Sequence, residues 1–488
     1  MKFLTVHGHF YQPPRENPWL GRVEAEDGAV PFHDWNERIT AECYAPNSRN
    51  LKRISFNFGP TLLSWLESQH PETYASILQA DRASRGERGG HGNALAQAYN
   101  HLIMPLATRR DKVTQVRWGI EDFRHRFGRE PEGMWLPETA ADNETLDVLA
   151  ESDLKFTILA PRQARRVRPA PNGQWKDVTG GQIDPSQAYH YTCGSGRSLA
   201  LFFFDAPISR AIAFEGALAQ GETLRARLVG GFSPDRTTPQ LVHVATDGES
   251  YGHHHRFGHR ALAAALEKIE REGNISLTNY GAFLAAHPPT HEVEIIERTS
   301  WSCAHGVERW RSDCGCRVGH PDWHQRWRAP LRDTMDWLRD ELDLFYEVRL
   351  GKLLKDPWAA RDDYIHVILD RSKDSKAEFF HGHQRSPLDS FHEAEALKLL
   401  ELQCHRLLMF TSCGWFFDDI SGLEAVQVLK YAARAMQLAG SLGFSGLEEE
   451  FIRRLAAAPS NVPEYGDGPQ VYRRLVLPSK VDVQLTPL

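Results

Sequence analysis

The sequence lacks any apolar run that approaches the roughly 18 consecutive residues of a membrane-spanning helix. Near the N-terminus only the short run Phe3–Val6 is apolar, which is too short for the core of a secretory signal. Cysteine is also scarce: the 488 residues contain seven, an odd number that does not favour a disulfide framework. We therefore expect a cytoplasmic protein in a reducing compartment, with no membrane partner.

An excess of positive charge is missing as well. Lysine and arginine number 57 against 64 aspartate and glutamate residues, which gives a net charge of -7 at pH 7. Nucleic-acid-binding proteins usually present a basic face, so we expect no nucleic-acid partner. With 41% hydrophobic and 25% charged residues the composition is typical of a globular protein, and the length predicts two or three domains.

The N-terminal part of the chain alternates short apolar runs with helical segments. Strands are predicted at 2–8, 132–138, 155–161, 198–209 and 240–249. Helices are predicted at 61–79, 112–128, 143–153 and 260–273. Strands separated by helices of this length indicate parallel βαβ units, arranged either as a barrel or as an open sheet.

From residue 323 onward the pattern changes to long amphipathic helices with few β-rich runs between them. The segments are 328–354, 392–413 and 422–440, in which apolar residues recur at helical spacing. We therefore predict an α/β domain over 1–322 and an α-helical domain over 323–488.

Two carboxyl groups stand at the ends of predicted strands. Glu138 ends the run 132–138, and Asp247 lies at the end of the apolar part of 240–249. In a parallel barrel the carboxyl ends of the strands carry the active site. Cleavage of a glycosidic bond requires two carboxyl groups at such a place. Taken alone, each acid is also typical of a helix N-cap or an ion pair.

Histidines offer a different chemistry. The three consecutive histidines at 253–255 cannot all point at one ion, because metal-ligating histidines need a wider spacing. His7 and His9 lie two residues apart on a strand and therefore share one side of it. Together with Asp247 and His253 they define the alternative of a metal-dependent deacetylase.

A second dense cluster combines thiols with an imidazole. Cys303, His305, Cys314 and Cys316 are four soft ligands within fourteen residues, and four is the number that a structural zinc ion requires. The spacings differ from the usual Cys-x-x-Cys knuckle, so buried thiols beside a polar loop remain the alternative. Tryptophans that suit stacking on sugar rings lie nearby, at 301, 310, 323 and 327.

Taken in order, these motifs resemble glycoside hydrolase family 57, over about residues 1 to 320 of the chain. A first His-Gln-Pro region is similar to HGHFYQPP, in which Phe10 and Tyr11 separate His9 from Gln12 and Pro13. The second region resembles GHGNALAQAYNHLIMPL, and the third, with a Trp-x-x-Glu motif, resembles WLPE. The fourth, an Asp-Gly-Glu motif, resembles DGESYG, and the aromatic fifth resembles SWSCAHGVERW.

The resemblance implies an incomplete (β/α)7 TIM-like barrel followed by a helical domain that accompanies a bacterial subset of the family. It implies a retaining mechanism on α-glucans or oligosaccharides, with Glu138 as the nucleophile, Asp247 as the acid/base and no cofactor or metal in the site. Amylase, 4-α-glucanotransferase and branching activities all fit, and a sugar-binding or regulatory protein on the same barrel is the further alternative. The substrate-binding residues expected are His9, Gln12, His91, His101, Trp135, Glu249, Tyr251, His253, Trp301, His305 and Trp310.

Overall fold

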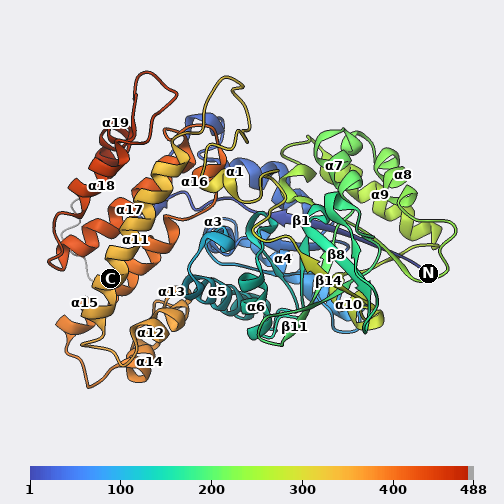
Figure 1. Ribbon diagram of the computed structural model, residues 1–488, viewed down its shortest axis with the longest axis horizontal. Coiled ribbons are helices and arrows are strands. Elements are labelled where there is room, and N and C mark those ends of the chain that lie inside the picture. The colour runs from blue at the N-terminus through green and yellow to red at the C-terminus, as the bar shows by residue number, and fades with distance from the viewer. Residues whose placement is uncertain (482–488) are drawn as a thin grey trace. The chain divides into compact units, whose positions relative to one another are not determined.

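The structure of the chain is a computed structural model that describes residues 1–481 (Figure 1). It contains two compact units, each assembled from separate stretches of the chain. The first comprises Met1–Gln12, Ala25–Tyr99 and Phe123–Ser302. The second comprises Pro13–Glu24, Asn100–Asp122 and the chain from Cys303 onward. The domain boundary at 322/323 stays a prediction.

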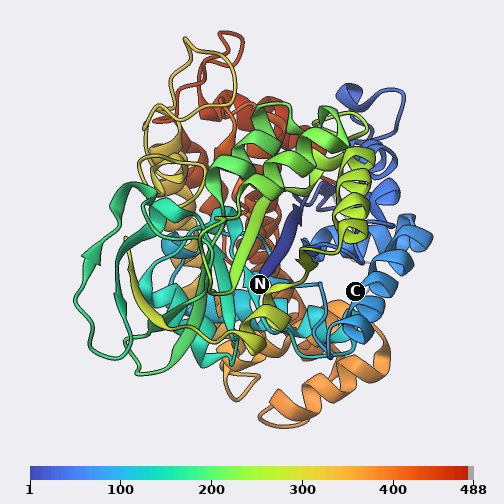
Figure 2. The same ribbon diagram turned by 90° about the vertical axis from the view of Figure 1, so that its right-hand side faces the viewer.

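Parallel strands form the framework of the first unit. Within the described part of the chain, seven of them follow one another in the order β12 (Gln240–Asp247), β1 (Lys2–Phe10), β4 (Ser55–Phe58), β5 (Ala96–Gln97), β6 (Met134–Trp135), β7 (Phe156–Leu159) and β11 (Ser198–Phe203). Single parallel bridges from Phe56 to Ala94 and from Gly133 to Phe156 continue the run between ladders. Figure 2 shows β1 beside β12 at its centre.

The two ends of this run come together without forming a ladder. The backbone N–H of Asp205, just after β11, donates to the carbonyl of His243 on β12 at 2.8 Å. Such a run, curved until its first and last strands meet but not fully paired there, is an incomplete barrel. An apolar core of buried side chains packs between these strands; it includes Trp135, Phe156, Ile158 and Phe202.

Helices connect these strands where the sequence predicts them. The predicted helices 112–128, 143–153 and 260–273 correspond to α5 (Arg109–Phe127), α6 (Asn143–Glu151) and α9 (Gly258–Glu272). In α9 the residues Leu262, Leu266 and Ile269 recur on one buried face. The helix ends at Gly273, whose φ of +67° suits a residue without a side chain.

Two element predictions need correction. The stretch 61–79 is not one helix: α3 (Pro60–Gln69) ends before Pro71, which begins α4 (Pro71–Glu87), because proline lacks the N–H and clashes with the preceding turn. The strand predicted at 198–209 ends at Phe203. Asp205 then caps α7 (Ala206–Phe214), and its carboxylate accepts the N–H of Ile208 at 2.9 Å.

A mostly antiparallel excursion extends the sheet beyond β11. It consists of β10 (Tyr189–Thr192), β14 (His291–Ile295), β8 (Ala164–Pro169) and β9 (Lys176–Asp177), in that spatial order. Among the described strands of this excursion, only the single pairing of β10 with β14 is parallel. β14 and β8 pair antiparallel from His291 to Ile295, with a shift of register between Glu294 and Ile295. Salt bridges such as Arg166–Glu294 tie their exposed faces together.

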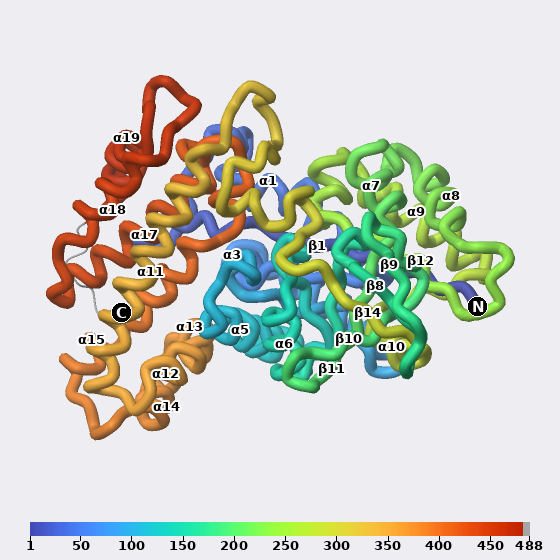
Figure 3. Tube along the Cα trace, in the orientation of Figure 1, coloured from blue at the N-terminus to red at the C-terminus, as the bar shows by residue number. Residues whose placement is uncertain are grey.

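The second unit is mainly helical, as predicted. Its long helices are α11 (Arg328–Leu350), α15 (Ser390–Leu408) and α17 (Leu423–Ser441), and α15 packs against both of the others (Figure 3). They match the three amphipathic segments of the sequence. Among residues 1–481, no helix combines the length and the apolar character needed to cross a lipid bilayer.

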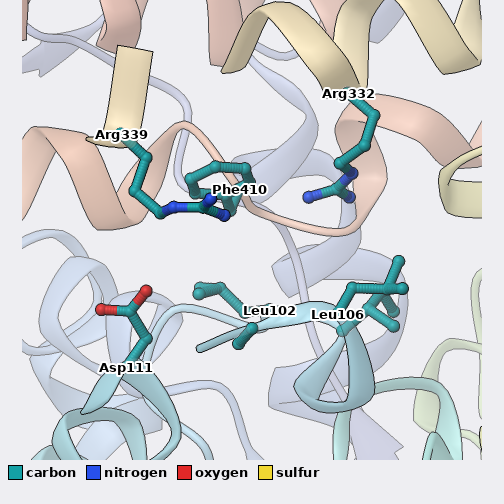
Figure 4. A pocket seen from close by; sticks show the side chains of 8 residues that line it. Leu102, Leu106, Asp111, Arg332, Arg339 and Phe410 are labelled. Atoms are coloured by element: carbon teal, nitrogen blue, oxygen red, sulfur yellow. The ribbon is translucent and has the colours of Figure 1, made fainter. Parts of the chain in front are cut away.

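A small cavity lies inside the second unit, with Arg339 and Phe410 on one side of it and Leu102 and Asp111 on the other (Figure 4). Its charged groups are already engaged. The carboxylate of Asp111 pairs with Arg361 at 3.0 Å and Arg406 at 2.6 Å. The cavity is therefore a packing feature of a charged interior, not a candidate ligand site.

Candidate active site

Glu138 is held in an unusual backbone conformation just after β6. Its φ of 58° lies in the left-handed region, and Thr139 follows with a φ of 48°. For residues with side chains this conformation costs on the order of 1–3 kcal/mol and persists only where surrounding contacts enforce it. Here the amide of Gln163 supplies such contacts, since it accepts from the Thr139 hydroxyl at 2.9 Å and donates to the Thr139 carbonyl at 2.8 Å.

Two donors from a neighbouring segment orient the carboxylate of Glu138. The indole N–H of Trp301 donates to Oε2 at 2.9 Å, and the hydroxyl of Ser302 donates to the same oxygen at 2.5 Å. The backbone N–H of Trp301 also donates to the Glu138 carbonyl at 2.9 Å. Glu138 is thus fixed at both its backbone and its side chain, which is what a nucleophile in a defined line of attack needs.

Asp247 lies at the carboxyl end of β12, paired in register with His9 of β1. Its side chain meets solvent, and among the described residues none donates a hydrogen bond to its carboxyl group. Desolvation by the protein around it, and then the negative charge of Glu138, raise the pKa of Asp247 to about 7. A carboxyl group with this pKa can give and take a proton near neutral pH.

Close packing explains the two glycines of the segment DGESYG, Gly248 and Gly252. A Cβ on Gly248 would lie 2.2 Å from the ring of Phe10, and one on Gly252 would lie 2.4 Å from the carbonyl of Glu42. Since no side chain fits at either place, the turn after Asp247 can pack this closely only with glycine.

Glu249 is buried two residues further on. Its Oε1 accepts a hydrogen bond from the hydroxyl of Tyr44 at 2.7 Å and one from the backbone N–H of Tyr11 at 3.0 Å. Burial, and then the charge of Asp247, raise the pKa of Glu249 to about 8. Glu249 therefore secures the turn after β1 as a mostly protonated group.

Aromatic rings line the strand ends beside the two acids. His9 stacks between Tyr11 and Trp135, with centroid distances of 5.7 and 5.1 Å, and Trp301 meets Trp135 edge to face at 5.1 Å. Burial lowers the pKa of His9 to about 3, so its imidazole is neutral at physiological pH. The result is an uncharged aromatic wall, a surface that suits the apolar faces of sugar rings.

An amide network fixes the histidines in this wall. Nε2 of His7 donates to Oδ1 of Asn57 at 3.1 Å, and the Asn57 amide N–H groups donate to Nδ1 of His9 at 2.9 Å and to Oε1 of Gln97 at 2.8 Å. Asn57 is the last residue but one of β4, and Gln97 ends β5. We did not identify these two residues from the sequence, although the rule that polar residues at strand ends form the site applies to both. Ser302 was missed as well, although it directly follows Trp301.

Three further predicted residues lie in the first unit and make contacts of their own. The side-chain N–H of Gln12 donates to the Tyr11 carbonyl at 3.0 Å. Tyr251 is fully buried, and its hydroxyl accepts from Thr246 at 3.2 Å. His253 pairs with Glu42 at 2.5 Å. Their substrate-binding roles stay predictions, and the contacts seen are those of supports.

Of the other predicted residues, His91 lies in the first unit and is not brought together with the two acids. His91 lies before β5, against Glu132 before β6, at the opposite, N-terminal ends of these strands. The remaining three, His101, His305 and Trp310, belong to the second unit. There the His101 ring contacts the Ser412 hydroxyl at 2.6 Å, and the Trp310 indole N–H donates to the Ser412 carbonyl at 3.2 Å.

The ligand set of the deacetylase alternative is not assembled. Both ring nitrogens of His7 are engaged, by Ser55 and Asn57, and His253 is turned to Glu42. Within residues 1–481, only the thiol cluster around Cys303 brings three or more His, Cys, Asp or Glu side chains close enough to hold a metal ion. Acid–base chemistry by Glu138 and Asp247 is what this arrangement supports.

Comparison with known proteins places this geometry in a family. Residues 31–296 match Glycosyl hydrolase family 57, and residues 323–486 match a Domain of unknown function (DUF3536). The chain belongs to glycosyl hydrolase family 57.

Solved structures share the fold at low sequence identity. An exo-type maltose-forming amylase from Pyrococcus sp. ST04 aligns with a TM-score of 0.76 at 18% identity, over 98% of this chain and 92% of that one. A branching enzyme from Pyrococcus horikoshii aligns with a TM-score of 0.56 at 15% identity, over 93% and 94%. These matches confirm the predicted fold class, a TIM-like barrel with a helical C-terminal region.

Characterised sequences match more locally. An α-amylase from Pyrococcus horikoshii is 23% identical over 308 residues, which are 61% of this chain and 43% of that protein. Alpha-amylase 1 of Dictyoglomus thermophilum is 27% identical over 107 residues, 22% of this chain and 15% of that protein. The chain thus aligns with less than half the length of either relative.

Proposed function

We propose that the chain is a retaining glycoside hydrolase or transglycosylase that acts on α-glucans. The observation that carries the proposal is the contrast between two carboxyl groups, one just after β6 and the other on the last residue of β12. Glu138 is fixed by two donors, whereas Asp247 is solvent-accessible with a pKa raised to about 7. A pair of carboxyl groups in contrasting environments is the usual basis for assigning a nucleophile and an acid.

In this proposal Glu138 attacks the anomeric carbon while protonated Asp247 gives its proton to the departing glycosidic oxygen. The glycosyl-enzyme ester has no charge on Glu138, so one of the two causes that raise the pKa of Asp247 disappears. Asp247 therefore stays deprotonated at this stage, and the carboxylate is the form that takes a proton from water or from an acceptor hydroxyl group. Hydrolysis follows with water and chain transfer with a sugar.

The substrate class rests on the aromatic wall and on the relatives. Rings of His9, Trp135 and Trp301 offer flat, uncharged faces. The relatives are named as α-amylase, maltose-forming amylase and branching enzyme. We extend this to α-glucans or oligosaccharides for this chain, with a cytoplasmic location and neither nucleic acid nor a membrane as partner.

The test is to incubate the purified chain with amylose and with maltooligosaccharides and to follow product lengths, branches and reducing ends. Asp247→Asn should lower the rate by roughly 10²–10⁴-fold, the usual contribution of general acid–base catalysis. Glu138→Gln should lower it at least as much, because the ester cannot form. Glu215→Gln, a surface substitution in the same unit, is the matched control and should leave the rate unchanged.

The anomer released first distinguishes the mechanism. A retaining enzyme gives the α-anomer, which NMR detects before mutarotation, and it requires carboxyl groups about 5–5.5 Å apart. A β-anomer would contradict the nucleophilic role of Glu138. Unchanged substrates in all samples would contradict α-glucan activity.

A further inference from the structure

The cluster of Cys303, His305, Cys314 and Cys316 in the second unit is not part of the proposed catalytic site. We propose that these four side chains bind one zinc ion in a closed, tetrahedral, structural site. The inference does not depend on which reaction the barrel performs.

The distances within the cluster are those of a tetrahedral coordination shell. The sulfur of Cys303 lies 3.9 Å from that of Cys314 and 3.7 Å from that of Cys316, and Nδ1 of His305 lies 3.7 Å from the Cys316 sulfur. All four ligand atoms lie within 4.8 Å of one another. Two sulfurs bound at about 2.3 Å to one tetrahedral zinc are roughly 3.8 Å apart. A disulfide would bring them to about 2.05 Å.

Two tight turns deliver the ligands. The N–H of Gly306 donates to the Cys303 carbonyl at 3.2 Å and closes a turn that places Nδ1 of His305 at 3.7 Å from the Cys316 sulfur. Gly315, between the other two cysteines, has a φ of 81°, which lets Cys314 and Cys316 present their sulfurs to the same point.

The chain around the cluster has little regular secondary structure to hold it in place. Between Cys303 and the start of α11 at Arg328 the only regular element in the described chain is the single turn Glu308–Trp310. Irregular segments of this length are uncommon in compact proteins. Here Arg328 donates to the Cys316 carbonyl at 2.8 Å, which fixes one side of the cluster. Four protein ligands leave no open position, so the ion would stabilise this loop and would not activate water.

The experiment measures metal in the full chain, purified under reducing conditions without chelator and passed through gel filtration. Mass spectrometry of the metal content should find about one zinc per chain. Cys314→Ser and Cys316→Ser should each lose most of it, whereas Cys413→Ser, which removes a thiol outside the cluster, should keep it. Replacement by cobalt should give the absorption bands of a tetrahedral thiolate complex.

Three results would contradict the zinc-site proposal. Wild-type protein without zinc in which Cys314 and Cys316 both react with a thiol reagent would overturn the proposal. A disulfide between any two of the cluster cysteines would do so too. Zinc retained equally by the serine variants would place the ion elsewhere. If a serine variant does not fold, the zinc content and cobalt spectrum of the wild-type chain still decide.

Discussion

Two carboxyl groups near the proposed nucleophile carry raised pKa values, and their surroundings separate their roles. Glu249 is 3% exposed and accepts hydrogen bonds from Tyr44 and Tyr11, whereas Asp247 reaches solvent. A substrate can therefore meet only Asp247. The charge of Glu138 contributes to the pKa of Asp247, which links the two acids of the proposed mechanism electrostatically.

This linkage predicts the pH dependence of the reaction. Asp247 must be protonated to act as the acid, and its pKa is raised to about 7, so kcat/KM should fall as the pH rises through about 7. Glu138→Gln removes a negative charge and should lower the pKa of Asp247. Steady-state rates measured over a pH range give the pH at which kcat/KM falls. NMR of carbon-labelled aspartate in both proteins gives the change in the pKa of Asp247.

The control is Glu249→Gln, which removes the other raised carboxyl group. Its alkaline limb should stay near that of the wild type, because Glu249 is already mostly neutral at pH 7. An alkaline limb that disappears in this variant would assign the essential acid to Glu249. An Asp247 pKa that does not move in Glu138→Gln would remove the proposed coupling.

The sequence predicted the acids better than their surroundings. Glu138 and Asp247 could be found because each ends an apolar run, and the family resemblance gave them roles. Asn57 and Gln97 stayed hidden because a buried amide in an apolar strand leaves no periodic signal. His91 contacts Glu132 because both lie before the strands that follow them. The sequence pattern does not show at which end of a strand a residue lies.

At the scale of elements, the turn at the end of β12 requires a residue without a side chain at position 248. Gly248→Ala would place a methyl group 2.2 Å from the Phe10 ring, so the ring or the turn must move. We expect a loss of about 1–3 kcal/mol in unfolding free energy, typical of overpacking, and a lower kcat because Asp247 is displaced. Chemical denaturation and the glucan assay measure the two effects.

Gly194→Ala provides the comparison, because a Cβ there meets no heavy atom within 4 Å. Its stability should match or exceed that of the wild type, since alanine reduces the entropy of the unfolded chain. Equal stability of the two variants would show that the Phe10 contact does not constrain the turn.

Element boundaries show where local signals suffice. The end of α9 follows from Gly273, and the break between α3 and α4 follows from Pro71 once the rule for proline is applied strictly. The short strands β5 and β6 could not be delimited, because each has only two residues in ladder pairing. Their place in the barrel is set by neighbouring strands and not by their own sequence.

At the scale of the whole molecule, each compact unit is built from distant stretches of chain. Segment 100–122 belongs to the second unit although it comes before most of the barrel strands. No composition change marks its ends, so a contiguous boundary at 322/323 was the simplest prediction from sequence. What ties the segment into its unit is a buried ion cluster.

Asp111 is the centre of that cluster, and it gives the last prediction. It is 2% exposed and pairs with Arg361 of α12 (Pro357–Asp363) and Arg406 of α15. Burial would raise its pKa, but the two arginines outweigh this and lower it to about 2. Asp111→Asn removes the carboxylate that Arg361 pairs with and leaves Arg406 with Asp343 alone, which should cost about 3–5 kcal/mol in unfolding free energy.

The same cluster fixes the sign of the acid dependence. Because the folded pKa of Asp111 lies below its ordinary value of 3.8, its contribution to stability is present above about pH 4 and is lost as the pH falls towards 2. The stability difference between wild type and Asp111→Asn should therefore shrink on acidification. Asp340→Asn, which breaks an exposed ion pair with Arg339, should cost less than about 1 kcal/mol at any pH. Denaturant unfolding at pH 7 and pH 3 measures both; equal losses for the two variants would mean that the buried cluster does not hold segment 100–122 in its unit.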